Sequence, residues 1–113
     1  MTRILDLDET RSNTAGLVHL DTQKAAVGLD LTVASIYRLT GPGSLDFGGS
    51  ELEPAEREEV EPELRDAEDD YGWWELAPGT YIARYNETLD LAENRWATVL
   101  PLERLLAAGA SHA

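Results

Sequence analysis

The alternation of apolar and polar residues along the chain predicts a protein made mainly of short β-strands. Apolar residues occupy every second position from Val27 to Val33, within a predicted strand over Ala26–Leu39. A period of two is the strand period, since successive side chains point to opposite faces. The pattern blurs at Ser35–Tyr37, which indicates a bend or bulge. Shorter alternations predict further strands at Gly16–Asp21, Leu45–Phe47, Thr80–Tyr85, Thr88–Leu91 and Trp96–Leu100.

A Pro-Gly pair precedes one of these strands. Pro78-Gly79 fits a type II turn, because proline presets φ at the second position and glycine accepts the positive φ of the third. We therefore expect Gly79→Ala to destabilise the protein by about 1 kcal/mol or more, since a Cβ is strained at positive φ.

Helical spacing occurs near the end of the sequence. Pro101 suits the first position of a helix, and leucines follow it at 102, 105 and 106. Gly109 suits the position just after a helix end. The sequence therefore predicts one short helix over Pro101–Ala108.

Length and composition place these elements in one small domain. The chain has 113 residues, 42% of them hydrophobic, and this size is near the commonest for a domain. We expect residues 1–113 to form a single mainly β domain, a distorted barrel or sandwich. The absence of cysteine excludes disulfides and thiolate chemistry. No signal peptide or long apolar span is evident, so we expect a cytoplasmic protein without membrane contact.

The chain is strongly acidic. Its 22 Asp and Glu against nine Lys and Arg give a net charge of −13. Such a surface repels nucleic-acid phosphates and anionic lipid, so no nucleic-acid partner is expected. Acids also outnumber bases elsewhere in the chain, which favours a halophilic origin, where salt screens the self-repulsion.

Half of the acidic residues lie in Glu51–Asp70, eleven in all. This insert is predicted to be solvated and mobile, with a short helix over Ala55–Val60 as the alternative. A Ca²⁺ loop is disfavoured because the required spacing of aspartates and glycine is absent. The following Trp73-Trp74 pair is expected to point to opposite faces of a strand, one toward the core and the other partly exposed or at an interface.

Two N-terminal features allow more than one interpretation. The stretch Met1–Thr14 could add a strand or lie loosely on the surface. His19 lies beside apolar residues, where a histidine is more often structural than a metal ligand. The sequence contains no phosphate-binding glycine loop of the Walker or Rossmann kind and no H-x-x-x-H zinc motif.

Two motifs carry a family resemblance. Trp74–Glu87 reads W-x-L-x-P-G-x-Y-x-x-x-Y-N-E, and Val27–Thr32 contains G-x-D-L. In this order and spacing they resemble the dUTPase/dCTP deaminase superfamily, above all the archaeal dUTP pyrophosphatases related to dCTP deaminase. The resemblance extends from about Leu17 to Gly109, interrupted by the acidic insert.

The resemblance implies hydrolysis of dUTP to dUMP and pyrophosphate, or deamination of dCTP, with Mg²⁺ and in a homotrimer. The resemblance makes Asp30 a candidate catalytic residue near the nucleotide. The alternative interpretation is that Asp30 is a solvated strand residue or caps a nearby loop. Where relatives carry P-R-S-S-L-x-R to hold the triphosphate, this chain has Pro101–Ala107. Glu103 and Arg104 replace the two serines and are the candidate substrate-binding residues.

The altered motif separates three functional hypotheses. Glu103 would repel a triphosphate, which Arg104 would offset only in part. The further strands of the family, with their catalytic acid, do not follow within this sequence, so the fold is expected to be incomplete at its C-terminal end. The first hypothesis is a divergent member with lost or weakened activity. The second is an active enzyme completed by residues from elsewhere, and the third is a non-catalytic protein-interaction module.

Overall fold

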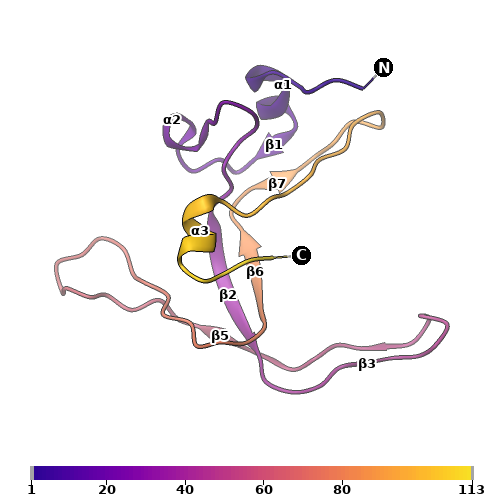
Figure 1. Cartoon of the computed structure of the whole chain (residues 1–113), viewed down its shortest axis with the longest axis vertical. Helices are drawn as coiled ribbons and strands as arrows, with labels where there is room; N and C mark the ends of the chain where they lie inside the picture. The colour runs from indigo at the N-terminus through magenta and orange to yellow at the C-terminus, as the bar shows by residue number, and fades with distance from the viewer. Residues whose placement is uncertain (1, 113) are drawn as a thin grey trace.

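A three-stranded antiparallel sheet forms the centre of the protein (Figure 1). The computed structural model describes residues 2–112. β2 (Val33–Leu39) lies between β5 (Arg57–Val60) and β6 (Tyr81–Tyr85). β2 is rich in β-branched and aromatic residues, which suit a pleated surface. The predicted mainly β class is confirmed.

Two small antiparallel pairs flank this sheet. β1 (Thr14–Ala15) pairs with β7 (Thr88–Leu89), and β3 (Ser44–Leu45) pairs with β4 (Leu52–Glu53). Within residues 2–112 the three sheets remain separate and do not close into a barrel. Both outer strands of the central sheet therefore keep an open edge there.

Among residues 2–112 three short helices accompany the strands, where the sequence predicted one. They are α1 (Leu7–Ser12), α2 (Leu20–Gln23) and α3 (Glu103–Ala107). α1 replaces the strand or loose segment expected at the N-terminus. Asp6 caps it, accepting a hydrogen bond from the Glu9 N–H while the Glu9 side chain returns to the Asp6 N–H. This capping box was readable in the sequence, since Asp6 and Glu9 stand three residues apart.

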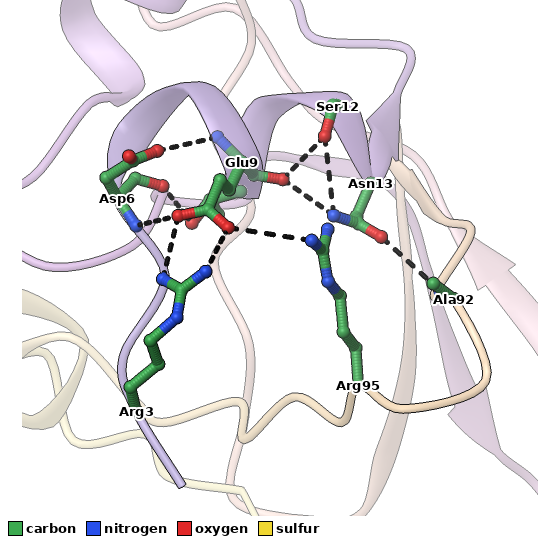
Figure 2. A network of polar contacts seen from close by, with 8 residues as sticks. Arg3, Asp6, Glu9, Ser12, Asn13, Ala92 and Arg95 are labelled. Carbon is green, nitrogen blue, oxygen red and sulfur yellow. Dashed lines mark hydrogen bonds and ion pairs between the residues drawn. The ribbon is translucent and has the colours of Figure 1, made fainter. Parts of the chain in front are cut away.

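A polar network joins α1 to the chain near Arg95 (Figure 2). The Glu9 carboxylate accepts hydrogen bonds of 2.8 and 2.6 Å from Arg3 and lies 3.5 Å from Arg95. The backbone carbonyl of Asn13 accepts a hydrogen bond of 2.8 Å from the backbone N–H of Asp90. The Arg3 hydrogen bond above all lowers the pKa of Glu9 from 4.5 to about 2. Charged hydrogen bonds thus fix a segment that has little apolar contact.

The predicted strand over Ala26–Leu39 begins only at Val33. Gly28 adopts a φ of +78°, and the Asp30 N–H donates to the carbonyl of Gln23 at 2.7 Å. The chain therefore turns around α2 instead of continuing the sheet. The strand predicted at Gly16–Asp21 is wrong, since β1 ends at Ala15 and Leu20 and Asp21 belong to α2.

The acidic insert contributes two short strands to the fold, β4 and β5. The alternative helix over Ala55–Val60 is wrong, because β5 pairs with β2 from Arg57 opposite Leu39 to Val60 opposite Ile36. The insert is solvated, since almost all of its residues are exposed, and its predicted mobility stays a prediction. An exposed acidic segment can form an edge strand, since charged side chains there face water. Beyond β5, Trp74 donates its indole N–H to the Val60 carbonyl at 2.8 Å, while Trp73 stays 41% exposed.

Of the predictions for the C-terminal part of the chain, one is wrong and one is confirmed in part. Trp96–Leu100 forms no strand, since no ladder partner lies beside it within residues 2–112. α3 starts at Glu103, two residues after Pro101. Its end is confirmed, because Gly109 adopts a φ of +87° and donates to the Leu106 carbonyl at 2.9 Å. The following N–H, of Ala110, returns to the Leu105 carbonyl at 3.1 Å, which completes a Schellman motif.

The prediction of a type II turn at Pro78-Gly79 is wrong. Gly79 does not adopt a positive φ, which the third position of that turn requires. The strand that follows is confirmed, with β6 starting at Tyr81. Tyr81 donates its hydroxyl hydrogen to the Ala77 carbonyl at 2.6 Å, so the corner is fixed by a side chain instead of a glycine.

Apolar burial is slight. Ile36, opposite Val60 and Ala83, is the one buried apolar side chain among residues 2–112. The radius of gyration is 17.1 Å, against ~13 Å for a compact chain of this length. The flanking pairs β3–β4 and β1–β7 expose their leucines, whereas β2 keeps Val33, Tyr37 and Leu39 half-buried.

Candidate functional site

A buried glutamine holds the backbone of the first motif. Gln23 is 3% exposed, and its side-chain oxygen accepts from the N–H groups of Val18 and His19 at 2.9 and 2.7 Å. Its side-chain nitrogen donates to the Asp30 carbonyl at 2.9 Å. Since the Asp30 N–H also donates to the Gln23 carbonyl, both backbone groups of Asp30 are fixed. A buried polar group pairs in this way because an unpaired one is costly.

A buried carboxylate joins the first motif to the second. Glu87 is 7% exposed and accepts from the Thr32 N–H and, at 2.7 Å, from the Thr32 hydroxyl. Asn86 donates to the same hydroxyl at 2.9 Å and through its backbone to the Thr32 carbonyl at 2.9 Å. Residues 55 positions apart in the sequence thereby form one unit. We name Gln23, Asp30, Thr32, Asn86 and Glu87 the polar clasp.

Gly16 packs against this clasp. It adopts a φ of +77°, and a Cβ built there would stand 2.6 Å from the Asn86 carbonyl oxygen. Only glycine fits both the conformation and the space. The loop before α2 can therefore close over the second motif.

The clasp orients the candidate catalytic residue toward α3. The Asp30 carboxylate, 24% exposed, lies 3.9 Å from the Arg104 guanidinium, which is 79% exposed. The structure thus brings together two residues that the sequence proposed separately. In Figure 1 α3 lies beside the start of β2, as this contact requires.

Glu103 belongs to the same surface. Leu102, Glu103, Arg104 and Ala107 line an open depression of about 430 Å³ on α3. These are the positions where the resemblance expects arginines and serines. The depression therefore contains one cation and one carboxylate, with apolar side chains at the other two positions. Near Asp30 it can bind an anion through Arg104 but offers no further cation.

The sequence did not indicate Gln23 and Glu87 of the clasp as site residues. A lone glutamine and a glutamate at a corner carry no periodic signal, and their role depends on partners far along the chain. His19 enters the site through its backbone N–H. A three-ligand cluster of His, Cys, Asp or Glu suited to a metal is absent from the described part of the chain.

Known proteins similar to this chain are archaeal. A protein of Archaeoglobus fulgidus is 39% identical over 94 residues, covering 83% of this chain and 51% of its own length. A Halobacterium salinarum protein is 34% identical over 86 residues, covering 76% and 50%. A Methanococcoides burtonii protein is 27% identical over 95 residues, covering 84% and 52%. Each is named "Probable deoxyuridine 5'-triphosphate nucleotidohydrolase".

The chain belongs to the dUTPase-like superfamily. It spans about half the length of the curated relatives that it matches. No family model matches it, and no solved structure matches it. Among residues 2–112 of this dUTPase-like chain, no helix is long and apolar enough to cross a membrane.

Proposed function

We propose that this dUTPase-like chain binds a deoxynucleoside triphosphate, dUTP before dCTP, and hydrolyses it to dUMP and pyrophosphate weakly or not at all. One observation carries the proposal: the polar clasp presents Asp30 to Arg104 at 3.9 Å, beside the altered motif. The names of the relatives support the nucleotide, and the residues of α3 support the low rate.

The argument for weak hydrolysis is electrostatic. Phosphoryl transfer depends mostly on positioning and on cations that meet the developing charge. Arg104 is the cation that lines the α3 depression, and Asp30 already neutralises part of its charge. Glu103 adds a negative charge that a triphosphate must approach. Loss of a single such donor costs ~10²–10³ in rate at other hydrolytic sites.

Mg²⁺ fits this site in a limited way. It is commonly held by one or two carboxylates together with substrate phosphates and water. Asp30 offers one partly exposed carboxylate, so it would hold a Mg²⁺ ion that the triphosphate also binds. When bound, the ion would neutralise phosphate charge, while Arg104 would bind phosphate oxygens.

Assembly and setting form part of the proposal. A homotrimer would cover apolar residues that the single chain exposes, such as Trp96 at 72% and Leu100 at 74%. Because a net charge of −13 repels other copies, this assembly would form best in the salt of a halophilic cytoplasm. A protein-interaction module without nucleotide binding is the second candidate, supported by the same exposed residues.

Calorimetric titration with a non-hydrolysable dUTP analogue and Mg²⁺ tests the proposal. We expect binding that Arg104→Ala weakens about tenfold, since one charge-assisted contact is lost. Arg84→Ala, a matched change at an exposed arginine of β6, should leave binding unchanged. Absence of binding at low and at multimolar salt would contradict the proposal and favour the interaction module.

A pyrophosphate assay on the same samples tests the rate. Turnover near ~1 s⁻¹, an ordinary enzyme rate, would contradict weak hydrolysis. Leu102→Arg combined with Glu103→Ser restores the cation and hydroxyl of the family motif. This variant should bind the analogue more tightly than the unchanged chain.

A further inference from the structure

Gln23 holds Asp30 across a small exposed loop. Lys24 and Leu29 form an antiparallel bridge at the base of this loop, so the chain returns to place Asp30 beside Gln23. Gln23 then contacts both backbone groups of Asp30, at 2.7 Å through its own carbonyl and at 2.9 Å through its side-chain nitrogen. The position of Asp30 in the candidate site therefore depends on one residue.

Apolar packing does not fix this part of the chain. Residues 24–27 are exposed, and Gly28 and Leu29 are only half-buried. Ile36, the single buried apolar side chain among residues 2–112, lies farther along the chain in β2. Hydrogen bonds to a buried amide are therefore what hold Asp30 in place, and a buried amide keeps such bonds because an unpaired polar group is costly.

Gln23 itself is not available to a ligand. It is 3% exposed, and its side-chain oxygen already accepts from the N–H groups of Val18 and His19. The Asp30 carboxylate, by contrast, is 24% exposed and lies beside Arg104. Any influence of Gln23 on a bound nucleotide must therefore pass through the backbone that it holds, in which Asp30 is the residue of the candidate site.

We propose that Gln23 is a positioning residue for the nucleotide site, because its side-chain N–H fixes the position from which the Asp30 carboxylate acts. The inference rests on the function proposed above, in which Asp30 would hold a Mg²⁺ ion that the triphosphate also binds. A glutamine suits this role because its side chain donates and accepts at once. An apolar side chain of the same length provides neither bond, and a carboxylate provides only the acceptor.

Calorimetric titration with the non-hydrolysable dUTP analogue, once in Mg²⁺ and once in EDTA, tests this role. The ratio of the two dissociation constants measures the gain in affinity that Mg²⁺ provides. Asp30→Asn should reduce this ratio about tenfold, because one charge-assisted contact is lost. Gln23→Met, which is uncharged and similar in length, should reduce the ratio at least about threefold and leave the affinity in EDTA within about twofold.

A double variant separates positioning from a general loss of stability. Because Gln23 acts through Asp30, Gln23→Met should reduce the ratio no further when Asp30→Asn is already present. Asn13→Leu is the matched control, since it also replaces a buried amide, 6% exposed, by an apolar side chain of similar size. The Asn13 side chain contacts the Glu9 carbonyl and the Ala92 N–H, outside the site, so this variant should keep the ratio of the unchanged chain.

Hydrogen exchange of the Asp30 amide provides a second measurement, which needs no ligand. This N–H donates to the Gln23 carbonyl, so its exchange reports how firmly the two residues are held together. Exchange should accelerate in Gln23→Met and in Gln23→Glu, which keeps the acceptor but loses the N–H donor, more than in Asn13→Leu. Far-UV circular dichroism identifies a variant that does not fold, and the other Gln23 variant then provides the test.

The possible failures of this inference and of the proposed function are distinguishable. An unchanged ratio in the Gln23 variants, a further loss in the double variant, an equal loss in Asn13→Leu, or unchanged exchange of the Asp30 amide would each overturn the inference and leave the proposed function intact. Absence of binding by the unchanged chain would overturn the proposed function and this inference with it.

Discussion

The polar clasp and the hairpin formed by β3 and β4 show two opposite ways of ordering a chain with little core. In the clasp, Gln23 and Glu87 are 3% and 7% exposed and their polar atoms are paired. In the hairpin, a fixed turn presents Phe47 entirely to water. In this chain, a defined backbone conformation therefore does not require the burial of apolar side chains. The polar atoms of the clasp find their partners within one chain, whereas the apolar side chains of the hairpin stay exposed.

The two regions should differ in how substitutions affect the stability of the single chain. Substitutions in the clasp should change the stability of the single chain, because their partners lie within it. Substitutions of the exposed apolar side chains of the hairpin should change that stability little, because these side chains touch little of their own chain. Glu87→Ala and Gly16→Ala test this expectation for the clasp. Changes at Glu9 and Gly79, which lie outside the clasp, follow in order of decreasing expected effect.

Glu87→Ala should be the most damaging. It leaves the half-buried Thr32 N–H and hydroxyl without the carboxylate that they contact. Loss of charged hydrogen bonds from a buried site costs about 2–4 kcal/mol. Urea unfolding followed by circular dichroism measures the change. Glu93→Ala, at an exposed glutamate, should lie within about 0.5 kcal/mol of the unchanged chain, and equal effects of both variants would refute the clasp.

Gly16→Ala should follow, at about 1–3 kcal/mol. The added Cβ meets the Asn86 carbonyl oxygen at 2.6 Å, and the residue must also keep a φ of +77°. Gly28→Ala is a closely matched control, since its φ is +78° and no atom lies within 4 Å of the added Cβ. The difference between their unfolding free energies isolates the close approach. A smaller loss for Gly16→Ala than for Gly28→Ala would contradict that contact.

The sequence predicted local structure best where one short pattern decides it. Gly109 stops α3 because only the residues before it need to be helical, and β6 follows from its own alternation. The alternation at Ala26–Leu39 failed at its start. There a turn depends on Gln23, whose role as a buried partner of Asp30 is settled by tertiary contact alone.

The candidate site was predictable in part for a related reason. Asp30 and Arg104 could be proposed from the family motifs, but their approach at 3.9 Å depends on how α3 folds back beside β2. The strand predicted at Trp96–Leu100 shows the same limit. Its alternation suits a strand, yet a strand also needs a neighbour to accept its hydrogen bonds, and residues 2–112 supply none.

The Glu9 network should make stability depend on pH in a defined interval. Folding lowers the pKa of Glu9 from 4.5 to about 2, chiefly through its hydrogen bond with Arg3. The stabilisation is therefore complete above pH 4.5, decreases as the pH falls toward 2, and is absent below both values. Because the groups are near the surface, salt should reduce the effect.

Unfolding free energies of the unchanged chain and Glu9→Gln, measured from pH 2 to pH 7, test this dependence. The difference between the two proteins should grow between pH 2 and 4.5 and stay constant above. Asp8→Asn, a change at a neighbouring helical acid, provides the control for the lost charge. A difference that is independent of pH would show that the Arg3 contact does not hold in solution.

Gly79→Ala should have the smallest effect, within about 0.5 kcal/mol. The sequence predicted a larger loss on the basis of a type II turn, but Gly79 lacks the positive φ that would strain an alanine. An added Cβ would lie 3.7 Å from the Tyr81 ring, an ordinary contact. Alanine also restricts the unfolded chain, which offsets small losses in the folded state. Thermal unfolding of Gly79→Ala and Gly16→Ala therefore compares the same substitution at a site away from the clasp and at a site packed against it. A loss of stability above about 1 kcal/mol for Gly79→Ala would contradict this prediction and support the type II turn.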